Sequence, residues 1–584
     1  MRDFLKQVLA VIVGTLVVSA FSSVMMMMMF ISMILASDQT TPVADGSVLH
    51  LKLSGTISER VQQDELSTWM NMATEEEQGL DDILTAIRVA ETDDRVDGIY
   101  IEGGLLNAEV ATLKEIRDAL LKFKESKKFV IAYGDNYTQG AYYVASVADK
   151  VYVNPSGMID WHGVASQPMF FKELLEKVGV KMQVFRVGTY KSAVEPFTAT
   201  EMSEANREQV SSYITDIWQG ICQEVSASRK IAVDTLNQYA NDYATLWEHN
   251  KYIETHLADS LFYIDQLRGE LRRMTGRDNF TLVTPTELAT NEKPLNSKNE
   301  IAVYYAYGDI VDQSSGVGTQ SEIVGNKVVN DLDQLAEDEE IKAVVLRINS
   351  GGGSAYASEQ MWRAIQELKK KKTVVVSMGD YAASGGYYMA CGADRIFAQP
   401  STLTGSIGIF GLVPDASGLL TDKLGLHFDV VKTNEAADFG ALGRSFNAAE
   451  SAAMQQHVER GYKLFLDRVG QGRNMNFAQV DSIAQGRVWT GNQALKIGLV
   501  DELGSLQDAI AYAAKKANVA DYEVSNYPAP LGFFETLTTS YQEDYLEGKM
   551  RSALGDYYQP LRFVSTLGNR PSLQARMPYA PCLR

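Results

Sequence analysis

The chain has 584 residues, with 54 Lys and Arg against 74 Asp and Glu, so its formal net charge is -20. This length predicts about two to four domains, and a hydrophobic share of 45% is enough to bury large cores. The acidic balance excludes nucleic acid as an expected partner, because such binding depends on Lys and Arg neutralising phosphates. Three widely spaced cysteines give neither a disulfide framework nor a metal-binding CxxC pattern.

The first predicted element is a membrane-spanning helix over residues 8–36, a stretch without any charged residue. At about 1.5 Å per residue it exceeds the ~30 Å hydrocarbon core, whereas the apolar region of a cleaved signal peptide has only about 7–15 residues. Arg2 and Lys6 precede the stretch and no Lys or Arg follows until Lys52, so the positive-inside rule keeps the N-terminus cytoplasmic. We therefore expect residues 1–45 to hold a cytoplasmic end and an anchor, with the rest of the chain on the outer face, which in a bacterial cell is the periplasmic side of the inner membrane.

The rest of the chain contains an internal repeat at a fixed offset of 245 residues, the separation of Gly134 from Gly379. The matching pairs are Gly134-Asp135 with Gly379-Asp380, Gly140 with Gly385, Tyr142-Tyr143 with Tyr387-Tyr388, Ala148-Asp149 with Ala393-Asp394, and Pro155-Ser156 with Pro400-Ser401. So many identities in one register predict two copies of one fold. We place the first copy at residues 46–295 and the second at 296–527, linked by the polar stretch 290–299. The tail 528–584 has no counterpart in the first copy, and its role stays open.

Within each copy, strands and helices are expected to alternate. In the second copy, residues 343–348, 373–378 and 395–398 are apolar runs typical of buried strands, while residues 357–369 and 384–391 are typical of helices. Such alternation predicts βαβ units and a parallel sheet covered by helices on both faces. The predicted fold class is therefore α/β.

Two glycine-rich turns of the second copy, residues 349–354 and 383–386, lie where predicted strands end. Glycines let backbone N–H groups approach a ligand closely, and the helix that follows each turn adds its positive end, so both turns suit an oxyanion. Either turn alone is more often a simple strand-to-helix connection. Two of them in one βαβ unit favour an oxyanion hole, and the lack of a Gly-Lys-Ser/Thr ending disfavours a phosphate loop.

Ser384 lies at the start of the second of these turns, where its hydroxyl could act as a nucleophile. A serine needs a neighbouring base for that role. The histidines that could supply one are His50, His162, His249, His256, His427 and His457. None has a recognisable triad context, and catalytic partners cannot be chosen from sequence distance.

Four segments carry a specific resemblance to a known family: 188–197 (GTYKSAVEPF), 382–388 (AASGGYY), 400–408 (PSTLTGSIG) and 486–491 (GRVWTG). In this order they are similar to the long, duplicated form of signal peptide peptidase A, also called protease IV. The resemblance implies a crotonase-like fold in each copy and a membrane-anchored serine endopeptidase with a Ser/Lys dyad, without a metal or another cofactor. It also implies a homo-oligomer, a tetramer, that degrades signal peptides and other hydrophobic peptides.

The resemblance also implies a role for individual residues. Ser384 corresponds to the nucleophile, Lys191 to the general base, and Ser406 to the serine that orients this lysine. The backbone N–H groups expected to bind the oxyanion are those of Gly352, Gly353 and Gly385. Gly351 stands where the family usually has proline, which keeps these N–H groups but loosens the turn.

The repeat supports a composite site independently of the resemblance. At the offset of 245, Ser384 aligns with Gln139, so the first copy has lost the nucleophile. The second copy has no lysine at residues 434–436, the place that matches Lys191. Each copy therefore lacks what the other retains, and we expect one site for each chain, formed between the copies.

The chemistry requires that Lys191 be neutral at working pH. A lysine with its ordinary pKa of about 10.4 is almost fully protonated at pH 7, and burial can lower that pKa by up to ~3–5 units. Val194 and Phe197 are consistent with a dry environment. Glu195 would raise the lysine pKa if it lay close, so we expect its side chain to point away.

Three alternatives remain open from the sequence. A crotonase-type acyl-CoA enzyme would use the oxyanion glycines without a nucleophilic serine. A catalytically idle scaffold would bind membrane peptides without cleaving them. A Ser-His-Asp peptidase, similar to the Clp proteolytic subunit, would depend on one of the six histidines and tolerate loss of Lys191.

Overall fold

The computed structural model describes residues 6, 13–25, 28, 43–61, 77–292, 297–314, 322–529 and 573–577. Of the anchor predicted over residues 8–36, residues 13–25 and 28 are helical and the others lie outside the described residues. Within the described part of the chain, no helix combines the length and the apolar character needed to span a bilayer.

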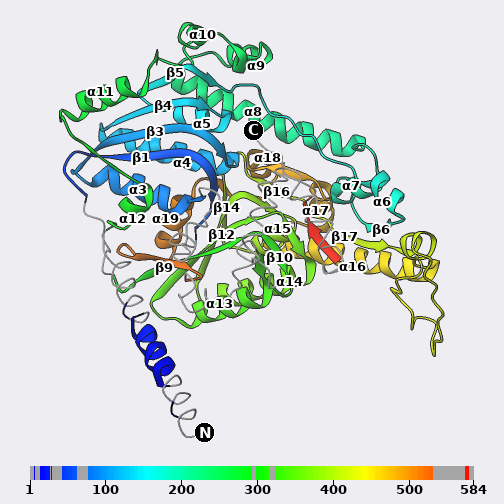
Figure 1. The fold of residues 1–584 in the computed structure, drawn as a ribbon. Helices are drawn as coiled ribbons and strands as arrows, with labels where there is room; N and C mark the ends of the chain where they lie inside the picture. Colours follow the sequence, from blue (N-terminus) through cyan, green and yellow to red (C-terminus); the bar gives the residue numbers. More distant parts are fainter. Residues whose placement is uncertain are drawn as a thin grey trace.

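The first copy builds one parallel sheet, whose long strands are coloured blue to cyan in Figure 1. In spatial order its strands are β2 (Glu77–Gly79), β1 (Ser47–Ser58), β3 (Val96–Asn107), β4 (Phe129–Tyr137), β5 (Lys150–Ile159) and β7 (Ser260–Leu261), with β8 (Thr281–Val283) beside β1. Neighbouring residues of one strand pack on opposite faces: Val48 and Leu49 are both fully buried, in different apolar clusters. Both faces are thus covered, which explains why these strands have near-continuous apolar sequences.

Helices cover the two faces of this first sheet. They include α3 (Leu80–Thr92), α4 (Val110–Phe123), α5 (Gln139–Ala145), α8 (Glu204–Arg229), α11 (Ile264–Thr275) and α12 (Pro285–Ala289). The side chain of Ser203 caps α8 by accepting a hydrogen bond from the backbone N–H of Asn206. Figure 1 shows α8 extending from the first sheet towards the second copy, where it contacts β18 (Val488–Thr490).

The second copy repeats the arrangement. In spatial order its strands are β18, β16 (Leu403–Gly405), β14 (Thr373–Ala383), β12 (Ile341–Ser350), β9 (Glu300–Tyr307) and β20 (Glu523–Tyr527), with β15 (Arg395–Ala398) and β19 (Glu502–Leu503) alongside. All of these pairs are parallel except β16 with β18. The helices of this copy include α13 (Gly325–Glu337), α14 (Ala355–Lys369), α15 (Gly385–Ala390), α16 (Ala448–Arg473), α17 (Phe477–Ile483), α18 (Gly491–Lys496) and α19 (Leu506–Lys516).

The predicted duplication is confirmed at the level of individual elements. Shifting α5 by 245 residues gives 384–390, against Gly385–Ala390 for α15. The strands and helices predicted for the second copy also appear at their expected places, as β12, α14, β14, α15 and β15. The fold is α/β, as expected.

A third sheet was not predicted, and it departs from the expected parallel pattern. In spatial order it contains β11 (Glu322–Val324), β10 (Asp309–Val311), β13 (Gly352–Ser354), β21 (Leu573–Arg576), β17 (Phe410–Asp415) and β6 (Lys181–Arg186). β6 comes from the first copy and pairs antiparallel with β17 of the second, while β21 comes from the tail. This sheet therefore joins three parts of the chain that are far apart in sequence.

A buried ionic network holds the two copies against each other. The guanidinium of Arg347 on β12 lies 2.9 Å from a carboxylate oxygen of Glu59 and 2.7 Å from one of Glu115 on α4. All three side chains are at most 4% exposed. Close by, Asp380 accepts hydrogen bonds from the backbone N–H (2.9 Å) and the hydroxyl (2.6 Å) of Thr112, in the first turn of α4.

Candidate active site

Lys191 is presented by a loop that follows β6 and directly precedes a short 3-10 helix (Ser192–Val194). The loop is tied to the second copy, because the backbone N–H of Tyr190 donates to the carbonyl of Gln485 at 2.8 Å. Gly486 has a φ of 78°, and a Cβ atom there would lie 2.6–2.7 Å from the backbone and Cβ of Lys191. Only glycine fits this contact, and the lysine side chain is completely buried.

Ser384 stands between the end of β14 and the start of α15. Its backbone has a φ of 55° and a ψ of -111°, a conformation that costs a non-glycine residue of the order of 1–3 kcal/mol and is concentrated at functional sites. Two backbone hydrogen bonds hold it: its N–H donates to the carbonyl of Gly405, and its carbonyl accepts from Tyr388, both at 2.8 Å. The strained turn is thus fixed by its surroundings.

The structure brings together the three side chains that the resemblance singled out. The Nζ atom of Lys191 lies 2.7 Å from Oγ of Ser384, 3.0 Å from Oγ of Ser406 and 2.9 Å from the carbonyl oxygen of Ser406. All three residues are fully buried. Burial lowers the pKa of the Lys191 amine well below its ordinary value, because desolvation disfavours the ammonium form.

Glu195 points away from the lysine, as expected. Its carboxylate accepts hydrogen bonds from the hydroxyl and backbone N–H of Ser203 and from the side-chain amide of Asn206. It also lies 4.0 Å from the guanidinium of Arg186. These partners satisfy the carboxylate, so the lysine pKa is shifted by burial alone.

The three predicted oxyanion glycines lie in two adjacent segments, β13 and the first turn of α15. A Cβ atom on Gly352 would lie 2.8 Å from the backbone N of Gly385, so the two turns meet here. The N–H of Gly352 already donates to Oγ of Ser350 at 3.1 Å. This leaves the N–H groups of Gly353 and Gly385 as the better candidates for an oxyanion.

Several residues that hold the lysine loop were missed from sequence. The amide of Gln209 on α8 donates to the carbonyl of Tyr190 at 3.0 Å and accepts from the backbone N–H of Val488 at 3.1 Å. The guanidinium of Arg487 lies 4.7 Å from the ring centre of Tyr190 and hydrogen-bonds its hydroxyl at 3.1 Å. The motif at 486–491 was the only sequence signal for this support, and it gave no hint of what its glycine and arginine contact.

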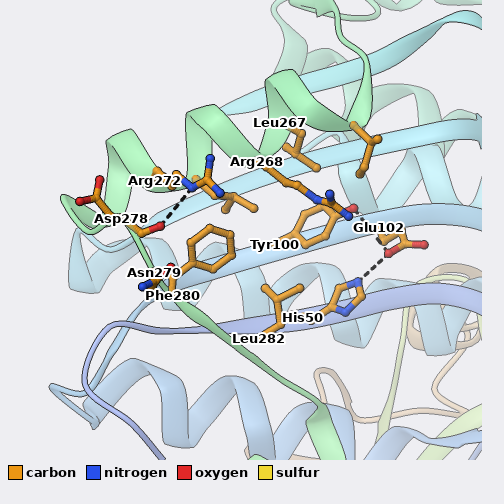
Figure 2. Close-up of a pocket in the computed structure, with 12 residues that line it drawn as sticks. His50, Tyr100, Glu102, Leu267, Arg268, Arg272, Asp278, Asn279, Phe280 and Leu282 are labelled. Carbon is orange, nitrogen blue, oxygen red and sulfur yellow. Dashed lines mark hydrogen bonds and ion pairs between the residues drawn. The ribbon is translucent and has the colours of Figure 1, made fainter.

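The histidines do not complete a triad with Ser384. Each of the six lies in the part of the chain that the structure describes, and there the Ser384 hydroxyl is hydrogen-bonded to the amine of Lys191. Figure 2 shows His50 in a pocket beside α11, where Nε2 lies 2.7 Å from a carboxylate oxygen of Glu102 and the ring stacks on Tyr100. No serine is found among the described residues that line this pocket. Among the described residues, no three His, Cys, Asp or Glu side chains are grouped as a metal site.

Comparison with known proteins places the chain in a family. The sequence model of peptidase family S49 matches twice, over residues 122–276 and 366–520, and the Clp protease model matches residues 310–403. Protease 4 of Salmonella typhi is 36% identical over 83% of this chain and 79% of its own length, and Protease 4 of Haemophilus influenzae is 34% identical over 85% and 83%. The chloroplastic serine protease SPPA of Arabidopsis thaliana is 31% identical over 82% of this chain and 70% of its own. The chain therefore belongs to peptidase family S49, with its domain duplicated, and is a serine protease.

Proposed function

We propose that Lys191 and Ser384 form the catalytic dyad of this protease. The observation that carries the proposal is the 2.7 Å contact between a completely buried amine and a buried serine hydroxyl. In its neutral form the amine has two N–H bonds and one lone pair. Two acceptors on Ser406, its carbonyl and its hydroxyl, can take the N–H bonds, which directs the lone pair at the hydroxyl of Ser384.

This arrangement supports a complete acyl-transfer cycle. The amine takes the proton of Ser384 while Oγ attacks the peptide carbonyl, and the N–H groups of Gly353 and Gly385 bind the oxyanion. The ammonium then returns the proton to the departing amine. Water, deprotonated by the same lysine, hydrolyses the acyl-enzyme, which restores the serine hydroxyl. Ser406 acts as a positioning residue, because it contacts the lysine and not the reacting carbonyl.

The first test is the pH dependence of peptide hydrolysis. Only the neutral amine can act as a base, so kcat/KM should rise with pH through the lowered pKa of Lys191 and reach a plateau well below pH 10. Initial rates on a fluorogenic apolar peptide from pH 5 to 10 measure this. In Ser406→Ala, the loss of a hydrogen bond should cost roughly 10- to 100-fold in kcat and displace the profile. A rate that climbs without a plateau up to pH 10 would mean that the base is an ordinary lysine.

The substrate class and location are also part of the proposal. We infer that the enzyme degrades signal peptides and other hydrophobic peptides, and that residues 8–36 anchor it in a bacterial inner membrane with its catalytic domains on the periplasmic side. The uncharged stretch and the early Arg2 and Lys6 support this placement. The full chain should stay in the membrane pellet after alkaline carbonate extraction, and its release into the supernatant would contradict the anchor. That the chain forms a homo-oligomer, a tetramer, stays a prediction. The molar mass of the detergent-solubilised protein, measured by light scattering, would test it.

The geometry favours this dyad over the other mechanisms. A Ser-His-Asp triad needs an imidazole at the serine, and the amine of Lys191 occupies that position. An acyl-CoA enzyme or a catalytically idle scaffold would not need a lysine buried against a serine in a strained turn.

A further inference from the structure

One buried side chain, the amide of Gln209 on α8, holds the residues on both sides of Lys191. Its Nε2 lies 3.0 Å from the carbonyl oxygen of Tyr190 and 2.9 Å from Oγ of Ser192. Because an amide nitrogen carries two N–H bonds, it can donate to both groups. Gln209 is 1% exposed and Ser192 is completely buried, so water does not compete for these bonds. The same group therefore fixes the chain before and after the lysine.

The oxygen of this amide reaches the second copy. Oε1 of Gln209 accepts a hydrogen bond from the backbone N–H of Val488 on β18 at 3.1 Å. β18 pairs with β16, and directly after β16 the backbone N–H of Ser406 donates to the carbonyl of Arg487 at 2.7 Å. Ser406 also supplies two acceptors for Nζ of Lys191. Gln209 thus connects the lysine loop to the strand that lies beside the lysine's acceptors.

The repeat links this contact to the copy that supplies the lysine. α16 is the counterpart of α8, and it begins and ends 244 residues later. Gln209 therefore corresponds to Ala453, an exposed residue with no amide in its side chain. The second copy, which has no lysine in the corresponding loop, also lacks the group that would hold one.

Other side chains of α8 also hold the helix against the second copy. Oγ of Ser212 accepts a hydrogen bond from the amide of Gln493 on α18 at 3.0 Å, and the carboxylate of Asp216 accepts one from the hydroxyl of Thr490. These bonds end on α18 and β18 and do not reach the lysine loop. Docking of the helix therefore does not depend on Gln209 alone, and its effect on the lysine can be measured separately.

We propose that Gln209 is the positioning residue of the general base. The inference rests on the dyad of the proposed function. By holding both neighbours of Lys191 at a fixed distance from β18, Gln209 keeps Nζ within hydrogen-bonding reach of Ser406. This geometry directs the lone pair of the amine at Ser384. A displacement of about 1 Å at a catalytic group can cost about 100-fold in rate, even when the altered residue is remote from the chemistry.

Steady-state kinetics of Gln209→Met on a fluorogenic apolar peptide tests the inference. Methionine is similar in size but cannot donate a hydrogen bond to Tyr190. We expect kcat to fall about 10- to 100-fold and KM to change less than about twofold, because the variant displaces the base and not the bound peptide. The matched control is Ser212→Ala, which removes a hydrogen bond across the same interface and should keep wild-type kcat.

The pH dependence of Gln209→Glu gives a second readout, which a loss of folding would not imitate. A protonated carboxyl can donate its O–H to the carbonyl of Tyr190, as the amide does, whereas a carboxylate cannot. Burial and the carboxylate of Glu195, which shares a hydrogen-bonding partner with Gln209, should raise the pKa of the new carboxyl. Arg487 acts in the opposite direction, but it is already paired with another carboxylate at 3.0 Å.

The ratio of kcat/KM between Gln209→Glu and wild type should therefore fall at least about tenfold from pH 5.5 to pH 8. It should recover when the same sample is returned to pH 5.5, because the protein stays folded and only the proton is lost.

The possible outcomes separate this inference from the proposed function. Wild-type kcat in Gln209→Met, a rise in KM alone, or a ratio for Gln209→Glu that does not change with pH would overturn the positioning role and leave the dyad standing. An equal loss of kcat in Ser212→Ala would do the same, since the effect would then belong to the whole interface. If Gln209→Met does not fold, the ratio measured with Gln209→Glu decides by itself. Activity that persists in Lys191→Met would overturn both proposals.

Discussion

Replacing Lys191 by methionine is expected to lower kcat/KM for peptide hydrolysis by about three to five orders of magnitude, and replacing Ser384 by alanine should do the same. The two groups act as a unit, so the double variant should be no worse than either single variant. Steady-state kinetics on a fluorogenic peptide measures all three. The matched control is Lys177→Met, an exposed lysine on α6 (Lys172–Val178), which should keep wild-type activity. Near-wild-type turnover in Lys191→Met would contradict the dyad.

The same Lys191→Met variant should be at least as stable as wild type at pH 7. Methionine retains most of the buried volume and removes an amine that prefers water. The folded pKa of this lysine lies below its unfolded value of about 10.4, so the unfolded state binds the proton more tightly and wild-type stability rises with pH across that interval. Thermal unfolding from pH 6 to 10 should therefore show a stability advantage of the variant that shrinks as pH rises. An advantage that stays constant over this range would mean that the amine is charged in the folded protein, because both states would then keep the same proton.

The second large effect is expected at the interface between the copies. Arg347→Met should destabilise the protein by about 3–5 kcal/mol, because it leaves Glu59 and Glu115 buried without their counter-charge. Chemical denaturation measures the loss. The control is Arg363→Met, which removes an exposed ion pair with Glu367 on α14 and should cost less than about 1 kcal/mol.

This destabilisation should also depend on pH. Burial already raises the pKa of Glu115 to about 7 in the presence of Arg347, and the arginine acts to lower it. When the pKa of a carboxyl is higher in the folded than in the unfolded state, the protein loses stability as pH rises above the unfolded pKa, because the unfolded state then releases the proton more readily. Without the arginine, the loss of stability continues beyond pH 7. The difference in the free energy of unfolding between Arg347→Met and wild type should therefore widen from pH 6 to 8. A difference that narrows over this range would show that the network does not carry buried charge.

The part of the site around Ser384 could be predicted because neighbouring residues in the sequence mark it. Ser384 follows an apolar strand and precedes a glycine pair, a pattern that also indicates the turn in which the structure places it. Lys191 has no such local signature, and it was found only through a motif and through the lack of a lysine in the matching place of the second copy. Its distance from Ser384, 193 residues along the chain, is bridged by tertiary contacts that no periodicity reports.

The third sheet shows where sequence patterns fail. β21 has only four residues, Leu573–Arg576, too few for a strand period to be recognised against a turn or a helix. Its pairing with β13 and β17 is decided by backbone groups that every residue carries. The close approach of Gly486 to Lys191 is likewise a contact between backbones. The sequence therefore showed this glycine as part of a motif but did not show that it contacts the lysine.

The most direct measurement of the central claim is covalent labelling with a peptidyl fluorophosphonate, which reacts with activated serines, followed by peptide mass spectrometry. Wild type should carry one adduct, on Ser384, and its labelling rate should rise with pH through the lowered pKa of Lys191. Lys191→Met should fold normally and label at least about 100-fold more slowly. An adduct on another serine, or equal labelling rates in the two proteins, would contradict the account.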